Sequence, residues 1–186
     1  MERTTAQIAL FAALIAALGL IPPVMLGFGV PITAQSLGIM LCGAVLGARR
    51  GALAVLLFLV LVAAGLPLLS GGRGGLGLFA SPSVGFLVGW PVAAFVTGLI
   101  VSRWRGAPLA LVASVASVIG GIVVLYAFGT VGMALTLGRT LPEAAMLNVA
   151  YLPGDAIKAV LAGLITATLA RARPGSLPSR ADADIA

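Results

Sequence analysis

The chain has 186 residues, of which 61% are hydrophobic and only 9% are charged, and its formal net charge is +6. Soluble domains are about 45–50% apolar and about 25% charged, so this composition, with a mean hydropathy of +1.19, excludes a water-soluble globular domain. Histidine is absent and Cys42 is the single cysteine, which excludes Cys/His metal sites, His-based catalytic triads and intramolecular disulfides.

Apolar segments follow one another along the chain, separated by charged residues and by Pro/Gly clusters. A helix needs about 20 apolar residues to cross a membrane, so we expect an all-α integral membrane protein with six transmembrane helices in one domain, residues 1–170. The expected spans are about 6–26, 32–48, 51–69, 83–102, 107–132 and 151–170. The stretch from Thr4 to Ala48 has no charge and is too long for one crossing, so the Gly27 to Pro31 segment is expected to be a turn.

The basic residues predict the orientation of these spans. With the N-terminus in the cytoplasm, eight arginines lie inside and two lie outside, which is a clear positive-inside bias. The inner ones are Arg3, Arg49, Arg50, Arg103, Arg105, Arg171, Arg173 and Arg180, and the outer ones are Arg73 and Arg139. Arginines at the ends of apolar stretches are typical of membrane topology and not of a nucleic-acid surface. We expect a multi-pass protein of the cell inner membrane with both termini cytoplasmic.

The first segment is expected to be retained as a span. It is longer than the apolar region of a signal peptide and lacks a convincing cleavage site with small residues. A signal peptide is the less favoured alternative.

Three connecting segments have distinctive compositions. The outer loop from Ser70 to Gly77 is rich in glycine, whose backbone reaches conformations closed to other residues. Thr140 and Glu143 form a capping-box pattern, which predicts a short interfacial helix ending before Pro153. The tail, residues 171–186, is rich in charge and proline and has little to bury, so we expect it to be disordered in the cytoplasm.

Asp155 and Lys158 are the two charged residues that cannot be placed at a boundary, in a loop or in the tail. Counted back from Arg171 at 1.5 Å per residue, they lie roughly 24 and 20 Å from the inner boundary, in the outer third of a core about 30 Å thick. A spacing of three places both on one helical face. Asp155 follows Pro153 and Gly154, so its carboxylate falls in the first helical turn, where the helix dipole favours an anion.

Charges inside a membrane are costly and are functional by default. We therefore interpret Asp155 and Lys158 as a ligand site open to the outside, in which Asp155 accepts from N–H donors and Lys158 meets a carboxylate or another acceptor. A structural ion pair that fixes helix packing is the alternative. Arg73 is the other cation on that side, and its alternative role is that of a solvated or headgroup-bound boundary arginine.

Small residues repeat along the first span. Ala9, Ala13 and Ala17, and also Ala12 and Ala16, form small-xxx-small patterns that permit close helix approach. The pattern alone leaves internal packing and a partner interface equally open.

The motifs of energy-using proteins and enzymes are missing. The glycine-rich loop has Leu76 and Gly77 where a phosphate-binding loop needs Lys and Ser/Thr, so the chain cannot use ATP by itself. There is no pair of acidic residues at metal-ligand spacing and no nucleophile with an activating base. We expect no enzyme activity, no cofactor and no metal.

Three runs of the sequence resemble the BioY family, the biotin-specific substrate-binding (S) components of energy-coupling factor transporters. They are Val30-Pro31-Ile32-Thr33-Ala34-Gln35, the Gly71–Gly77 loop with the following Ser81-Pro82-Ser83-Val84-Gly85-Phe86-Leu87, and Leu152-Pro153-Gly154-Asp155-Ala156-Ile157-Lys158. The resemblance covers about residues 5–170, and the last run is the most specific part. It implies an S-component-like six-helix bundle with biotin bound near the outer face, and it agrees with the topology inferred from the charges.

The resemblance also implies site residues and partners. Asp155 would accept from the ureido N–H groups of biotin, and either Lys158 or Arg73 would meet the carboxylate. Gln35 and Thr33 would line the pocket, with Gly71 and Tyr151 as weaker candidates. The family works with a transmembrane coupling (T) subunit and a pair of cytoplasmic ATPases, and its use of an Ala-xxx-Ala face favours Ala9, Ala13 and Ala17 as the docking surface.

The run from Ser81 to Phe86 departs from the family pattern, which is commonly Gly-Pro-Thr-Gly-Gly-Tyr. Val84 replaces a glycine, and Phe86 lacks the tyrosine hydroxyl, which puts any role of that hydroxyl in question, while the proline and one glycine remain. Three functional alternatives remain at this point: an S component for another vitamin, a stand-alone facilitator of small solutes, and a structural subunit of a larger membrane complex.

Overall fold

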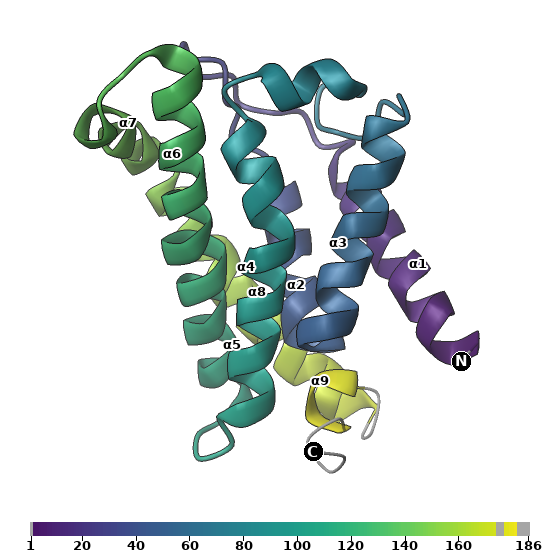
Figure 1. Ribbon diagram of the computed structural model, residues 1–186. Helices are drawn as coiled ribbons and strands as arrows, with labels where there is room; N and C mark the ends of the chain where they lie inside the picture. The colour runs from purple at the N-terminus through teal and green to yellow at the C-terminus, as the bar shows by residue number, and fades with distance from the viewer. Residues whose placement is uncertain (1, 174–176, 182–186) are drawn as a thin grey trace.

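Helix α2 (Gln35–Leu46) lies at the centre of a helical bundle and is buried along almost its whole length. It packs against α1 (Glu2–Leu18), α3 (Ala48–Ala63), α4 (Val84–Arg103) and α8 (Leu152–Ala172). The structure is a computed structural model and describes residues 2–173 and 177–181. Figure 1 shows the helices side by side along the long direction of the molecule, and the all-α fold predicted from the sequence is confirmed.

A long helix covers one side of this bundle. It consists of α5 (Leu109–Val118), a π-helical segment η2 (Ile119–Val124) and α6 (Leu125–Leu137) in direct succession. In the described part of the chain, three helices are long and apolar enough to cross a membrane: Val84–Arg103, Leu109–Leu137 and Leu152–Ala172. The others are shorter, and α2 has only 12 residues.

Several helix ends differ from the expected spans. Helix α1 ends at Leu18 and not near 26, because Pro22 and Pro23 follow and cannot continue a helix. Helix α2 begins at Gln35 and not at 32, and α3 ends at Ala63, before the expected 69.

Helix α6, in contrast, extends beyond the expected 132 to Leu137. It ends there because Gly138 adopts the left-handed conformation with a φ of 62°.

A sharp break at Gly47 separates α2 from α3. Its φ of 85° and ψ of 179° lie in a region that only glycine adopts readily. A Cβ atom on Gly98 of α4 would collide with the backbone of Gly47 and Ala48. The turn between α2 and α3 is therefore held directly against α4.

The loops at one end of the bundle form a layer over the helix ends. This layer contains residues 19–34, residues 64–83 with a 3₁₀ turn at Leu76–Ala80, and α7 (Leu141–Leu147) followed by a 3₁₀ turn at Asn148–Ala150. The predicted capping box opens α7, since Glu143 Oε2 accepts from both the backbone N–H and the hydroxyl of Thr140 at 2.9 and 2.8 Å.

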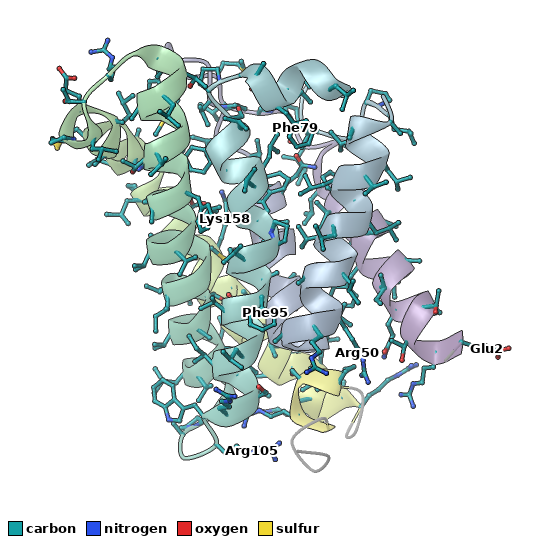
Figure 2. The ribbon with its side chains drawn as sticks, in the orientation of Figure 1. Glu2, Arg50, Phe79, Phe95, Arg105 and Lys158 are labelled. Carbon is teal, nitrogen blue, oxygen red and sulfur yellow. The ribbon has the colours of Figure 1, made fainter. Side chains whose placement is uncertain are left out.

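The opposite end of the bundle carries the described ends of the chain. Glu2, Arg50 and Arg105 lie at this end in Figure 2, and Phe79 lies at the other. The arginines predicted to be cytoplasmic lie in or next to the helix ends there, whereas Arg73 is in the loop layer and Arg139 lies in the connection between α6 and α7.

Part of the tail is folded, contrary to the prediction of disorder for residues 171–186. Helix α8 continues to Ala172, and α9 (Pro178–Ala181) packs against α2 and α4. The Ser179 hydroxyl donates to the Ala44 carbonyl at 2.7 Å, and carbonyls in the last turn of a helix lack helical partners. This hydrogen bond stabilises the ordered part of the tail, and the amino-acid composition of the tail does not indicate it. Residues 174–176 and 182–186 lie outside the described residues.

Candidate functional site

A pocket lies under the loop layer, between the first turns of α2, α4 and α8. Its cavity volume is about 60 Å³, several times the roughly 10–15 Å³ that one water molecule needs, so it is more than a packing gap. The residues that line it are Val30, Pro31, Ile32, Thr33, Gln35, Ser36, Leu69, Arg73, Ser83, Phe86, Leu87, Trp90, Leu125, Tyr151, Asp155 and Lys158. The sequence prediction and the structure therefore place Asp155, Lys158 and Arg73 around one cavity.

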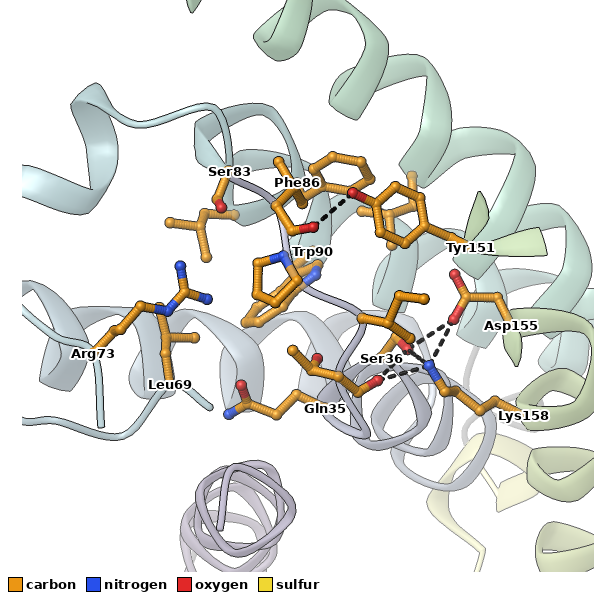
Figure 3. Close-up of a pocket in the computed structure, with 16 residues that line it drawn as sticks. Gln35, Ser36, Leu69, Arg73, Ser83, Phe86, Trp90, Tyr151, Asp155 and Lys158 are labelled. Carbon is orange, nitrogen blue, oxygen red and sulfur yellow. Dashed lines mark hydrogen bonds and ion pairs between the residues drawn. The ribbon is translucent and has the colours of Figure 1, made fainter. Parts of the chain in front are cut away.

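Asp155 and Lys158 form an ion pair at one end of this pocket (Figure 3). The distance from Lys158 Nζ to Asp155 Oδ1 is 2.9 Å, and the two side chains are 15% and 8% exposed. Ser36 of α2 lies between them, donating to Asp155 Oδ1 at 3.0 Å and accepting from Lys158 Nζ at 3.0 Å. The pair thus joins the first turn of α8 to the first turn of α2.

All three N–H groups of the Lys158 ammonium donate to acceptors of the protein. Its ammonium also donates to the Thr33 carbonyl at 2.6 Å, which together with Asp155 and Ser36 accounts for its three N–H groups. Thr33 therefore contributes its backbone oxygen to this network. A ligand must displace one of these acceptors to bind the ammonium.

Asp155 has one acceptor position left. Tyr126, from the first turn of α6, donates to Asp155 Oδ2 at 2.9 Å, in addition to the bonds of Ser36 and Lys158 to Oδ1. A carboxylate offers about four lone-pair positions. The described residues occupy three of them, which leaves the fourth, on Oδ2, for an N–H donor of a ligand.

Arg73 lies at the other end of the pocket. Two backbone hydrogen bonds between Leu69 and Arg73, of 3.0 and 3.1 Å, close a tight turn, in which Gly71 and Gly72 have φ values of 81° and 69°. The Arg73 Nε donates to the Ser70 carbonyl at 3.2 Å, and partial burial lowers the pKa of its guanidinium. An arginine stays charged in proteins. Among residues 2–173 and 177–181, no carboxylate is within ion-pair distance of Arg73.

The middle of the pocket is apolar and aromatic. Phe86, Leu87 and Trp90 line it from α4, and Figure 3 shows Phe86 and Trp90 between the two charged ends. Tyr151 packs edge-to-face against Phe86, with ring centroids 5.8 Å apart. The site therefore suits a ligand with an apolar body and a polar group at each end.

Two predicted pocket residues have all or part of their polar capacity used by the protein. Gln35 is fully buried, donates to the carbonyls of Ile15 and Leu68 at 3.1 and 3.0 Å, and accepts from the Ser70 N–H at 3.0 Å. Tyr151 donates its hydroxyl to the Val30 carbonyl at 2.9 Å. Both line the cavity and hold its walls together.

Gly71 does not line the cavity. It lies in the turn that precedes Arg73, and its positive φ explains why a glycine occupies this position.

The sequence reasoning missed Ser36, Tyr126 and Ser83. Ser36 directly follows Gln35, which was singled out, so its position beside a candidate pocket residue was a usable signal. Tyr126 follows the π-helical segment Ile119–Val124, whose extra residue per turn shifts the helix register. No periodicity argument indicates that its hydroxyl reaches Asp155.

The chain is an all-helical membrane protein whose pocket, under the loops at one end of the bundle, is built to bind a small molecule. It matches the BioY family over residues 2–175 and belongs to that family. The resemblance inferred from the sequence is therefore confirmed.

Relatives match over nearly the whole chain. The biotin transporter BioY of Rhodobacter capsulatus is 54% identical over 189 residues, covering 97% of this chain and all of that protein. The biotin transporter BioY of Rhizobium etli is 56% identical over 179 residues, covering 93% of this chain and 95% of that protein. The fold is similar, with a TM-score of 0.87 and 30% identity, to the crystal structure of the S-component for biotin from an ECF-type ABC transporter. That match covers 94% of this chain and 93% of the other.

Proposed function

We propose that this chain is the substrate-binding membrane subunit of a biotin uptake transporter and captures biotin in the pocket under the loop layer. The observation that carries the proposal is the polarity of the pocket. Among the described residues, a carboxylate with one free acceptor position lies at one end, a guanidinium without a carboxylate partner lies at the other, and aromatic residues lie between them. Biotin has ureido N–H donors at one end, a thiophane ring in the middle and a carboxylate on its valerate chain.

The contacts in the pocket favour one orientation of the ligand. Asp155 accepts from a ureido N–H through its remaining position on Oδ2, beside the Tyr126 hydroxyl. Arg73 pairs with the carboxylate, because the ammonium of Lys158 already donates to Asp155, Ser36 and Thr33. Lys158 then acts by holding Asp155 in place.

Titrating biotin into the detergent-solubilised protein without nucleotide tests this function, with saturable binding as the expected result. Two analogues serve as matched controls: dethiobiotin keeps the ureido group and the carboxylate, and lipoate keeps the carboxylate chain but lacks the ureido group. We expect dethiobiotin to compete and lipoate to fail. Absence of saturable biotin binding contradicts the proposal, and preferred binding of another vitamin in a competition panel identifies an S component of different specificity.

A transmembrane coupling subunit and a pair of cytoplasmic ATPases complete the proposed transporter, and ATP is used by those partners. Ala9, Ala13 and Ala17 support α1 as the docking helix, since all three are exposed on a face directed away from the bundle. Replacing Ala13 by Leu should reduce co-purification with the coupling subunit without changing biotin affinity. The control is Ala156→Leu, at an exposed alanine of α8, and equal effects of both changes contradict docking through α1. Biotin flux in vesicles without the partners would instead indicate a stand-alone facilitator.

The proposed location is the cell inner membrane, with both termini in the cytoplasm and the pocket facing outward. The end of the bundle that carries the termini also carries the arginines expected inside. In a Cys42→Ala background, a single cysteine at Gly77 should react with an impermeant maleimide added outside, and one at Gly106 should not. A Cβ atom at either position has open space around it. The reverse labelling pattern contradicts the orientation.

A further inference from the structure

The hydroxyl of Ser83 lines the pocket and has no hydrogen-bond partner in the described part of the chain. Ser83 is 6% exposed, and its Oγ atom is buried without a partner within residues 2–173 and 177–181. Buried polar groups are nearly always paired in folded proteins. A buried hydroxyl that borders a cavity and lacks a partner is therefore suited to donate to a ligand.

The Ser83 side chain also does not cap the helix that follows it. It is the N-cap of α4, where a serine side chain normally accepts from a backbone N–H of the first turn. Here its φ and ψ are −77° and −10°, and the side chain makes no capping bond. Its neighbour Ser81 serves the local backbone instead, donating to the Leu78 carbonyl at 2.6 Å and accepting from the Ser83 N–H at 3.3 Å.

The hydroxyl belongs to the same end of the pocket as Arg73. In Figure 3 Ser83 and Arg73 lie on the same side of the pocket, away from Asp155 and Lys158. Ser83 also begins a helix of 20 residues, whose N-terminal amides and dipole favour an anion. A guanidinium, a hydroxyl donor and a helix N-terminus thus lie on the same side of the cavity.

We propose that Ser83 and Arg73 together form a carboxylate subsite, in which the Ser83 hydroxyl donates to one carboxylate oxygen and the guanidinium pairs with the other. The subsite makes the protein specific for free monocarboxylic acids carried on an apolar chain, against their esters. This inference rests on the proposed biotin binding and deepens it, because it assigns Ser83 as a specificity-determining residue.

An ester separates the contribution of the subsite from that of the rest of the pocket. Biotin methyl ester keeps the ureido group and the ring but lacks the negative charge. Biotin and this ester are titrated into the wild-type protein and into Ser83→Ala. A hydrogen bond to a charged group is worth about a tenfold change in affinity or more, so Ser83→Ala should weaken biotin at least about tenfold. The affinity for the ester should stay within about twofold.

Ser117→Ala is the matched control, since Ser117 is buried and its hydroxyl also lacks a partner among the described residues, but it does not line the pocket. It should leave both affinities unchanged. Ser83→Thr, which keeps a hydroxyl, should restore the preference for biotin over the ester. If Ser83→Ala fails to fold, Ser83→Cys fills a similar space with a weak donor, and the same loss of preference is expected.

Equal weakening of biotin and its ester by the Ser83 variants overturns the subsite, and so does an unchanged biotin affinity. Failure of the wild-type protein to bind either compound contradicts the proposed function itself. Binding of both compounds with equal affinity by the wild type leaves the biotin site standing and refutes the carboxylate subsite alone.

Discussion

Tyr126 donates its phenolic hydrogen to Asp155 Oδ2 at 2.9 Å, although the two residues are 29 positions apart and belong to different helices. Ser36 and Lys158 bind the other oxygen. The carboxylate, which lines the pocket, is thus held from both sides in one orientation. This relationship makes Tyr126 a positioning residue for the proposed ligand contact.

Replacing Tyr126 by Phe tests this role. The ring remains and only the hydroxyl is removed, so the Asp155 carboxylate gains freedom to rotate. We expect biotin affinity to fall about threefold to tenfold, the effect of one hydrogen bond, as measured by titration. Dethiobiotin should weaken by the same factor, since it shares the ureido group. Tighter binding in the variant would mean that the hydroxyl competes with the ligand for Oδ2, contrary to a positioning role.

Asp155→Asn should have the largest effect on binding. The amide keeps the shape of the carboxylate but replaces one acceptor by a donor and leaves the partly buried Lys158 ammonium without its counter-ion. A hydrogen bond to a charged group is worth about 1.5–3 kcal/mol, and the new amide donor faces the ureido N–H groups, so we expect biotin affinity to fall about a hundredfold. Arg139→Gln, in the exposed loop before α7, is the control and should bind normally. Equal and negligible effects of the two changes would return Asp155 and Lys158 to a purely structural pair.

Removing Lys158 and removing Arg73 should have different effects on stability and on biotin affinity. Lys158→Met leaves Asp155 as a buried charge without its ion partner, so the free energy of unfolding should fall by about 3 kcal/mol. Arg73→Gln removes a single side-chain hydrogen bond, to Ser70, and should leave stability nearly unchanged while biotin affinity falls at least about tenfold.

Thermal unfolding without ligand and titration with biotin measure the two effects separately. If Arg73→Gln destabilises the free protein as much as Lys158→Met does, Arg73 is a structural residue and the assignment of the carboxylate to it is wrong.

The sequence predicted the helical architecture and both ends of the pocket, because charge and hydropathy report directly on membrane placement. Asp155, Lys158 and Arg73 could be found since a charge inside or beside an apolar segment is conspicuous. Which of the two cations, Lys158 or Arg73, is free to bind a ligand could not be predicted from the sequence. That depends on acceptors such as the Thr33 carbonyl, which every residue carries and whose position only the fold determines.

Gln35 shows a second case in which the sequence does not identify the partner of a polar side chain. Its identity fits a pocket ligand, and the structure gives its amide three backbone partners. A polar side chain in an apolar segment indicates that something must be satisfied, without telling whether a ligand or the backbone does so. Several helix ends were predicted wrongly for a related reason. The loop residues next to a short helix such as α2 are themselves apolar, so hydropathy does not separate them from the helix.

Gln35→Glu tests the structural role of this residue. The change removes both N–H donors and turns a charged oxygen toward the carbonyls of Ile15 and Leu68, so the end of α1 and the segment before Arg73 lose their link to α2. Unpaired buried groups cost about 1–3 kcal/mol each, and we expect the unfolding temperature in detergent to fall by roughly 5–10 °C. The control is Gln7→Glu, at a half-exposed glutamine of α1, which should change it little.

Because the linked segment positions Arg73, biotin binding by Gln35→Glu should weaken less than by Asp155→Asn, and it should recover when the protein is assayed well below its unfolding temperature. A variant that keeps the wild-type unfolding temperature and loses biotin would show that the Gln35 amide contacts the ligand directly.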